Sequence, residues 1–486
     1  MDIFGKMAMI VAAGLAAGAC ARQEFTMVTS TENEQWVKVA GFPEGAEGAE
    51  TEIVVGLQDE RQTMEGFGMC FSELSWRSLG RLSKEDYDSV MDELFAQEDD
   101  GARFTICRTP IGSSDFALKY YSYDDAPGDF SMAAFSVEND ESTLIPLIKD
   151  ALARNPELKI WASPWCPPQW MKRNGNYASK PLDVDGMKAV AERKRLELEN
   201  VMTDNGCRMT LHEGEDSFIL EERYLDAYAL YFKKYVEAYR DRGIDIYMVM
   251  PQNEFNSDQN FPSCTWTVDG LKRFMHKLVP AMKEEGVQVF FGTVERPSVG
   301  MVDAIFEDPE LGREVGGAAF QWAGRAIVGD VRAKYPDKTL IMSEQQCFNG
   351  ANSWADFMAA WALLKDNIDK GVSIYDYWNM SLFDGEVSTW RWQQNSLISV
   401  DYETGRFHYN YEYYEMKHAS RYIRPGAVCL GVSGSHDQAL AFRNPDGSLV
   451  LLIAETEGRA ENVTIKAGSR SVKVHIPASS LSTVVI

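Results

Sequence analysis

The sequence is poor in the residues that hold metal ions or form disulfide frameworks. It contains 8 cysteines and 6 histidines among 486 residues. The cysteines beyond Cys20 are scattered singly, with neither a CxxC pair nor an HExxH run. Walker A and GxGxxG motifs are absent too, and the dispersed histidines argue against a Ser–His–Asp mechanism. We therefore expect no metal site, no cofactor and no disulfide scaffold.

Basic residues are also few. Lys and Arg total 48 against 73 Asp and Glu, which gives a net charge of −25. Such a chain repels nucleic-acid phosphates, so no nucleic-acid partner is expected. Aromatic residues are abundant by contrast, with 12 Trp, 20 Tyr and 24 Phe. Most of them are expected in the core, but flat amphipathic rings also suit the apolar C–H faces of a neutral glycan.

Only the N-terminus has the features of a targeting segment. Lys6 precedes the apolar run Met7–Ala17, and Gly18-Ala19 precede Cys20. The run is shorter than the roughly 20 apolar residues of a membrane-spanning helix, and it predicts a signal peptide over residues 1–19. A Cys after small residues resembles a bacterial lipoprotein signal, which implies lipid on Cys20; ordinary secretion is the alternative. We expect an exported lipoprotein anchored to the outer membrane, periplasmic or at the cell surface, with the lipid as its only membrane contact.

The central part of the chain alternates short apolar runs with amphipathic helical runs. Continuous apolar runs are typical of parallel strands buried on both faces. Eight of them separated by helices predict a (β/α)8 TIM barrel over residues 65–424. The predicted strands are Glu65–Phe71, Arg103–Thr109, Leu158–Ser163, Ile246–Pro251, Val287–Thr293, Val315–Gln321, Thr339–Ser343 and Ser373–Trp378.

The two ends of the mature chain differ from the barrel. Residues 425–486 contain six short strand-like runs and no helical pattern, and residues 20–64 contain similar pieces. We expect the two to combine into one β-sandwich beside the barrel. The connection Trp170–Glu222 after the third strand is unusually long and holds a charged helical run, Ala189–Val201.

Two glutamates mark the predicted active site. Active-site residues of such barrels lie at the carboxyl ends of the strands. Glu254 follows the fourth strand and Glu344 the seventh. One such Glu would most often be a solvated loop charge, but a pair of carboxylates is what glycoside hydrolysis requires. Trp165 and Trp322, after the third and sixth strands, are expected to line the sugar site.

The sequence also contains the runs Glu65-Gly66-Phe67-Gly68, Cys107–Phe116, Tyr121–Asp125, Ala162–Gly175, Pro251–Glu254, Ser343–Cys347 and Ser388–Asp401. In these motifs the sequence resembles glycoside hydrolase family 30, the family of glucosylceramidases and β-1,6-glucanases. The resemblance covers nearly the whole mature chain. It implies a TIM barrel with a side β-sandwich and hydrolysis with retention of the anomeric configuration.

The resemblance also implies roles for individual residues. Glu254 matches the acid/base, expected to start protonated, and Glu344 matches the nucleophile, expected to be ionised. Other matches are Asp115 and Trp170 for the non-reducing-end sugar and Arg108, Asn253 and Trp378 for support of the pocket. The sixth strand departs from the family, because Gln321-Trp322-Ala323 replaces a His-Trp-Tyr-like run. A hydrogen bond from that Tyr to the nucleophile is therefore not expected here.

The predicted function is hydrolysis of β-glucosidic bonds, as a glucosylceramidase-like β-glucosidase or an endo-β-1,6-glucanase. The alternatives are a retaining β-xylosidase or β-fucosidase, and a surface glycan-binding protein without catalysis. Exo and endo action both stay open. The long connection Trp170–Glu222 would close the cleft and favour exo action, whereas an aromatic platform of Trp378, Trp390 and Trp392 would favour endo action.

Overall fold

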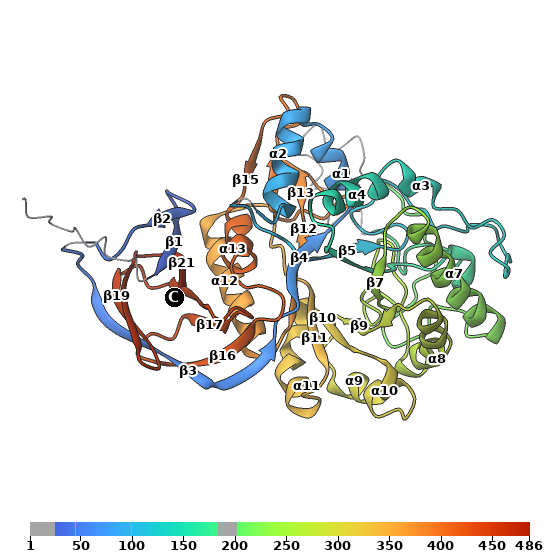
Figure 1. Cartoon of the computed structure of the whole chain (residues 1–486). Helices are drawn as coiled ribbons and strands as arrows, with labels where there is room; N and C mark the ends of the chain where they lie inside the picture. The colour runs from blue at the N-terminus through green and yellow to red at the C-terminus, as the bar shows by residue number, and fades with distance from the viewer. Residues whose placement is uncertain (1–24, 44, 99, 183–201) are drawn as a thin grey trace, which may run out of the picture.

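The computed structural model describes residues 25–43, 45–98, 100–182 and 202–486. The signal peptide, Cys20 and the helical run Ala189–Val201 lie outside the described residues. The described chain forms a barrel with a β-rich unit at its side (Figure 1), which confirms the predicted fold class.

Eight parallel strands form the barrel, and all eight predicted runs contribute one. The fifth is interrupted at Phe290, so that β8 pairs with β7 while β9 pairs with β10. The hydrogen-bonded order β8-β7-β6-β5-β4-β12-β11-β10-β9 therefore closes on itself through the two parts of that strand. The barrel strands are β4 (Gly66–Cys70), β5 (Ile106–Pro110), β6 (Lys159–Ser163), β7 (Ile246–Val249), β8 (Gln288–Val289), β9 (Phe291–Val294), β10 (Gly317–Gln321), β11 (Thr339–Glu344) and β12 (Ile374–Asn379).

Helices surround the barrel, and several of them, α2, α8 and α12 included, begin at polar capping residues. The side chains of Ser83, Thr267 and Ser353 accept hydrogen bonds from the first turns of α2, α8 and α12. The α-helices are α1 (Glu73–Leu79), α2 (Lys84–Phe95), α3 (Glu138–Glu141), α4 (Leu144–Arg154), α7 (Glu222–Arg240), α8 (Val268–Glu284), α9 (Val299–Phe306), α10 (Leu311–Glu314), α11 (Val328–Lys334), α12 (Trp354–Asp369) and α13 (Tyr411–Ser420). Two 3-10 helices are η1 (Gln169–Met171) and η2 (Trp322–Ile327).

The side unit is the expected β-sandwich of N- and C-terminal strands. The long strand β3 pairs with β16 along one part and with β19 along the other, and so links the two layers. Apolar side chains of both layers pack into one core. The strands are β1 (Thr26–Thr31), β2 (Val37–Val39), β3 (Ala49–Thr63), β16 (Val428–Gly434), β17 (Ala439–Arg443), β18 (Leu449–Glu455), β19 (Glu461–Ala467), β20 (Arg470–Ile476) and β21 (Ser480–Val485).

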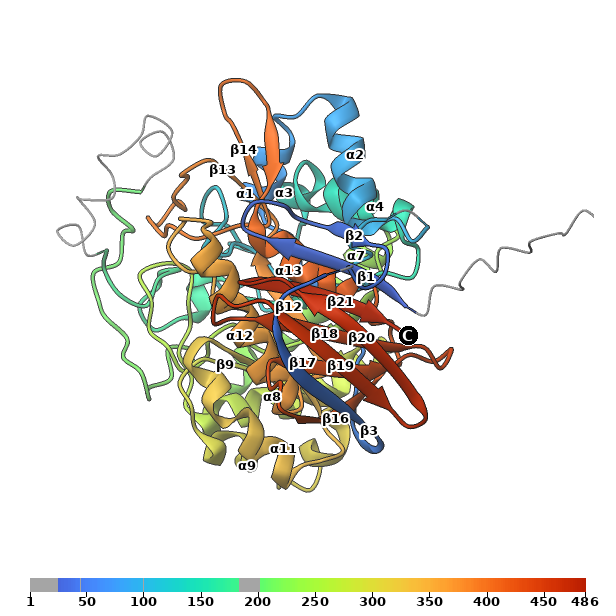
Figure 2. The same cartoon turned by 90° about the vertical axis from the view of Figure 1, so that its left-hand side faces the viewer.

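The sandwich packs on the barrel through α12 and α13 (Figure 2). Side chains of β17, β18 and β21, such as Phe442 and Leu452, join the barrel core. Within this junction His418 is fully buried, with Ser30 Oγ 2.9 Å from Nε2 and Thr483 Oγ1 2.8 Å from Nδ1. Burial and, to a lesser extent, the positive charge of the neighbouring Lys417 lower the pKa of His418 to about 3. The junction therefore holds a neutral imidazole.

A small sheet of β13 (Ser381–Phe383), β14 (Ile398–Val400) and β15 (Phe407–Tyr409) follows the eighth barrel strand. The sequence predicted neither this sheet nor α13, because the segment lacks a sustained apolar period. The seven cysteines from Cys70 to Cys429 are buried free thiols. None of the helices in the described ranges is both long and apolar enough to span a membrane.

Candidate active site

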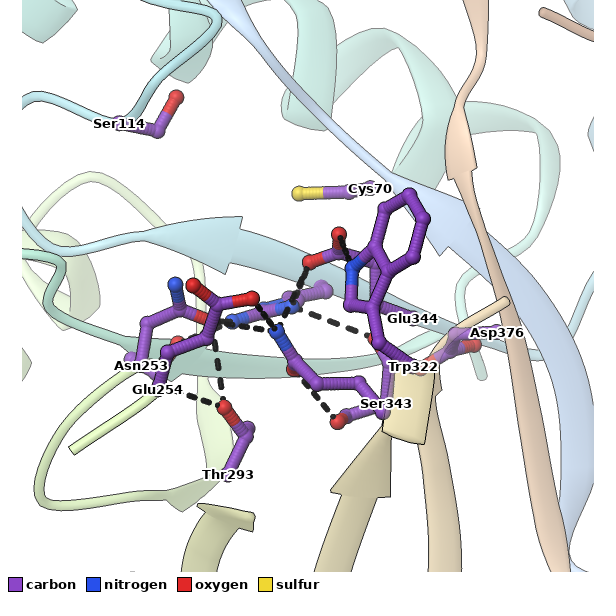
Figure 3. Close-up of polar contacts among 12 residues, drawn as sticks. Cys70, Ser114, Asn253, Glu254, Thr293, Trp322, Ser343, Glu344 and Asp376 are labelled. Atoms are coloured by element: carbon purple, nitrogen blue, oxygen red, sulfur yellow. Dashed lines mark hydrogen bonds and ion pairs between the residues drawn. The ribbon is translucent and has the colours of Figure 1, made fainter. Parts of the chain in front are cut away.

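Glu254 and Glu344 converge on one buried amide at the carboxyl end of the barrel. Glu254 follows β7, Glu344 ends β11, and Gln321 ends β10 between them. The Gln321 Nε2 atom donates to Glu254 Oε1 at 3.1 Å and to Glu344 Oε2 at 3.3 Å (Figure 3). Its carbonyl oxygen lies 3.0 Å from the Ser343 hydroxyl, which turns the amide nitrogen toward the carboxylates. The two glutamates are thus held on opposite sides of a single donor.

The backbone at two of these positions lies in the left-handed region. Glu254 has a φ of 47° and Trp322 a φ of 48°. Non-glycine residues in this region cost energy and cluster at functional sites. The turn at Glu254 is held by its backbone N–H, which donates to Thr293 Oγ1 at 2.8 Å. Thr293 Oγ1 in turn donates to Asn253 Oδ1 at 3.2 Å, so the end of β9 supports the loop that carries Glu254.

Arg108 on β5 organises the floor of the site. The guanidinium is fully buried and donates to Glu344 Oε2 at 3.2 Å and to Asn253 Oδ1 at 2.7 Å. The central guanidinium carbon, Cζ, lies 4.3 Å from the ring centroid of Trp165 and 5.5 Å from that of Trp378. A planar fork between aromatic faces suits arginine and not lysine. Arg108 thus places a positive charge beside Glu344. The residue next to Glu254 that it binds, Asn253, is uncharged.

Because their surroundings differ, the two carboxyl groups have different tendencies to bind a proton. Burial and the neighbouring Glu344 raise the pKa of Glu254 well above its ordinary value. Its Oε2 atom has no hydrogen-bond partner within the described part of the chain. Burial also raises the pKa of Glu344, but Arg108 and the Trp322 indole oppose that rise. The surroundings therefore favour a proton on Glu254 and a charge on Glu344.

Trp322 supplies a bond that the sequence did not lead us to expect. Its Nε1–H donates to Glu344 Oε1 at 2.8 Å. The departure from the family at Gln321-Trp322-Ala323 therefore does not leave Glu344 without a donor from this loop. Trp322 also borders the cavity, so it contacts both the predicted nucleophile and the space for a ligand.

The two glutamates open onto a cavity of about 160 Å³. Of the predicted site residues, Asp115, Glu254, Trp322 and Glu344 line it. Burial and Glu344 raise the pKa of Asp115 well above its ordinary value. Arg108, Asn253, Trp165 and Trp378 form the layer that supports these residues. The remaining lining residues are Gln259, Phe261, Glu295, Trp392 and Gln394.

Two predictions about aromatic residues are corrected by the structure. Trp170 does not border the cavity: its indole donates to the Asp124 carbonyl at 3.0 Å and packs edge-on against Phe130. The platform of three tryptophans is not formed either. Trp378 and Trp390 are buried, and Trp392 alone of the three is exposed, at 39%.

Three of the site residues that the sequence missed are Gln321, Thr293 and Glu295. Each lies at or just after the carboxyl end of a barrel strand, and that position was the available signal. None belongs to a motif, which is why no role was assigned. Among the described residues there is no group of three or more His, Cys, Asp or Glu side chains suited to a metal ion.

Comparison with known proteins gives a consistent set of similarities. The profile of the glycosyl hydrolase family 30 TIM-barrel domain matches residues 64–187, and that of the family 30 beta sandwich domain matches residues 426–484. The lysosomal acid glucosylceramidase of Mus musculus is 24% identical over 445 residues, covering 85% of this chain and 79% of that protein. The endo-1,6-beta-D-glucanase BGN16.3 of Trichoderma harzianum is 24% identical over 468 residues, covering 88% and 84%. The solved structure of the endo-beta1,6-glucanase BT3312 has a TM-score of 0.75 at 23% identity, covering 95% of this chain and 99% of the other.

Proposed function

We propose that the chain, which is similar to glycosyl hydrolase family 30 in both of its domains, is an O-glycosidase that hydrolyses β-glucosidic bonds by a two-step mechanism with retention. In this mechanism Glu344 attacks the anomeric carbon while Glu254 protonates the leaving oxygen. Glu254 then takes a proton from a water that attacks the anomeric carbon; the ester bond from that carbon to Glu344 breaks, and the sugar is released. The observation that carries the proposal is the convergence of two buried carboxyl groups, only one of them paired with Arg108, on one cavity.

The spacing of the carboxyl groups supports retention. Retaining glycosidases hold them about 5–5.5 Å apart, and inverting enzymes about 6.5–9.5 Å, to make room for a water. The shared Gln321 nitrogen lies 3.1 Å from one oxygen and 3.3 Å from the other, so those oxygens are at most about 6.4 Å apart. That separation leaves little room for a water between sugar and base.

The supporting residues have roles that follow from their contacts. Arg108 and Trp322 keep Glu344 charged and oriented, and Asn253 is fixed by Arg108 so that its side chain can serve the sugar 2-OH. Asp115 borders the cavity beside Glu344 and is suited to a hydrogen bond with a sugar hydroxyl. Trp165 and Trp378 act beneath the sugar, through Arg108.

A β-glucosidic substrate is supported by the relatives, since one is a glucosylceramidase and another an endo-1,6-beta-glucanase. β-Xylosides and β-fucosides are the alternatives that the substrate panel below resolves. Binding without catalysis is disfavoured by the intact pair of carboxyl groups with their separate proton states.

We further propose that the protein is exported and anchored by lipid on Cys20 at the outer membrane. The support is the sequence of residues 1–20 alone. Labelling of cells with a radioactive fatty acid tests it: the wild-type chain should incorporate label and partition with membranes, and a Cys20→Ser variant should do neither. Equal labelling of both chains would refute lipidation of Cys20.

The enzyme assay uses purified residues 21–486 with p-nitrophenyl β-glucoside, β-xyloside and β-fucoside, and with pustulan, laminarin and xylan. We expect activity on a β-glucosidic substrate. Glu254→Gln and Glu344→Gln should each abolish it, and Glu237→Gln, on the exposed face of α7, should not. Activity that survives in both active-site variants would overturn the assignment of the two glutamates.

A further inference from the structure

A third carboxylate borders the cavity, and the mechanism above does not use it. Glu295 directly follows β9 and is 8% exposed. It lines the same cavity as Glu254 and Glu344. A carboxylate so deeply buried is costly unless it is paired, so its retention here requires an explanation.

The backbone of Glu295 is fixed to the loop that carries the acid/base. Asn256, two residues beyond Glu254, accepts hydrogen bonds from the N–H groups of Glu295 at 3.3 Å and Arg296 at 3.2 Å. The Asn256 amide also donates to the Arg296 carbonyl at 2.9 Å. These three hydrogen bonds join the loop that carries Glu254 to the loop that carries Glu295, and they restrict the spacing between the two side chains.

Arg296 holds the charge of Glu295 in place from the solvent side. Its guanidinium is ion-paired with Glu295 and donates to Glu213 at 2.8 and 3.1 Å. Burial raises the pKa of Glu295, and Arg296 opposes that rise. The pair thus presents a negative group to the cavity and its positive group to the Glu213 side.

We propose that Glu295 is a positioning residue whose negative charge keeps the catalytic proton on Glu254 and so sets the upper pH limit of activity. The inference rests on the proposed function, because it assumes that Glu254 is the acid. Glu295 does not touch the reacting atoms; it acts through Glu254 across the cavity. Like charges in a poorly solvated site disfavour a second ionisation.

Several other groups face Glu254 and must be included. They are Glu344 at the end of β11, Asp115 in the loop after β5, and Arg296 behind Glu295; Arg108 compensates Glu344. After burial and Glu344, Glu295 is the next largest cause of the raised pKa of Glu254, ahead of Asp115. Removing the Glu295 charge should therefore lower the pKa of Glu254 without removing the proton donor itself.

The test is the pH dependence of kcat/KM on p-nitrophenyl β-glucoside for Glu295→Gln and Glu295→Asp. Glutamine keeps the shape of the side chain and removes its charge. Aspartate keeps the charge and shortens the side chain. An electrostatic role predicts that the basic limb moves to lower pH by about 0.5 unit or more in Glu295→Gln and stays in place in Glu295→Asp. A purely structural role predicts loss of activity in Glu295→Asp and an unmoved limb in Glu295→Gln.

Two controls sharpen the result. Glu213→Gln removes only the charge on the other side of Arg296 from Glu295. The basic limb of the pH profile of this variant should stay near that of the wild type. A 2,4-dinitrophenyl leaving group needs little acid catalysis, so the effect of Glu295→Gln should vanish with that substrate. An unmoved limb in an active Glu295→Gln enzyme overturns this inference alone. A wild-type protein without glycosidase activity overturns the proposed function and this inference with it.

Discussion

Replacement of Gln321 by leucine tests whether the shared amide holds the catalytic pair. Gln321 is fully buried, and its Nε2 atom lies within 3.3 Å of Glu254, Glu344 and Asn253. An amide nitrogen has two hydrogens, so at any moment it serves two of these three acceptors. Leucine keeps most of the volume and removes both hydrogen bonds. Both carboxyl groups then lose a donor and the restraint on their separation.

The size of the effect follows from the charge of the acceptors. A hydrogen bond to a charged group contributes about 1.5–3 kcal/mol, and each 1.36 kcal/mol is tenfold in rate. Loss of one such bond from the reacting geometry should lower kcat/KM about 10- to 100-fold. Because Gln321 lowers the pKa of Glu254, its removal should also move the basic limb of the pH profile upward. This shift is opposite in sign to that expected for Glu295→Gln.

The assay is kcat/KM on p-nitrophenyl β-glucoside between pH 4 and 9, with the midpoint of thermal unfolding recorded for each variant. Gln438→Leu, at a half-buried glutamine of the sandwich remote from the cavity, is the matched control and should behave as the wild type. A Gln321→Leu enzyme that unfolds near the wild-type temperature and retains kcat/KM within twofold would refute the assigned role.

Three further predictions follow from the site and the junction. Trp322→Phe removes the indole donor to Glu344, so kcat/KM should fall about 10-fold and the acidic limb should move to higher pH; an unmoved limb would refute the contact. Within the described chain the residues that line the cavity include four carboxyl groups and no Lys or Arg, so the cavity should repel a negatively charged sugar. We therefore expect p-nitrophenyl β-glucuronide to react at least about 100-fold more slowly than the β-glucoside, and equal rates would contradict this. The pKa of His418 is lowered in the folded protein, so the unfolded chain binds more protons below about pH 6.5. The free energy of unfolding should therefore fall by up to about 1.4 kcal/mol for each unit by which the pH is lowered from 6 to 4. Urea unfolding midpoints of the wild type and His418→Asn measure it, and the same pH slope in both would count against the assignment.

The barrel was predictable because its strands are buried on both faces and therefore read as continuous apolar runs. The fifth strand shows the limit of that signal, since the run Val287–Thr293 does not reveal the interruption at Phe290. Helix α13 was missed because its buried face carries Glu412, Glu415 and His418, which an apolar pattern cannot recognise. Burial of such groups depends on the sandwich that packs over them.

The sequence indicated which residues lie at strand ends, but it could not indicate positions that depend on distant packing. Glu254 and Glu344 were found from their strand ends. The position of Trp170 was not, because its indole is used by Asp124 and Phe130, whose proximity only the fold creates. Gln321 was read only as a departure from the family, yet its amide joins the two glutamates.

The central claim is double displacement by Glu344 and Glu254, and the anomer first released tests it most directly. Proton NMR of p-nitrophenyl β-glucoside hydrolysis, followed from the first minute, distinguishes α- from β-glucose before mutarotation mixes them. The account predicts that the β-anomer appears first and that the α-anomer grows only at the rate of mutarotation. Initial release of the α-anomer would contradict it, because inversion requires a water between the sugar and a carboxylate base.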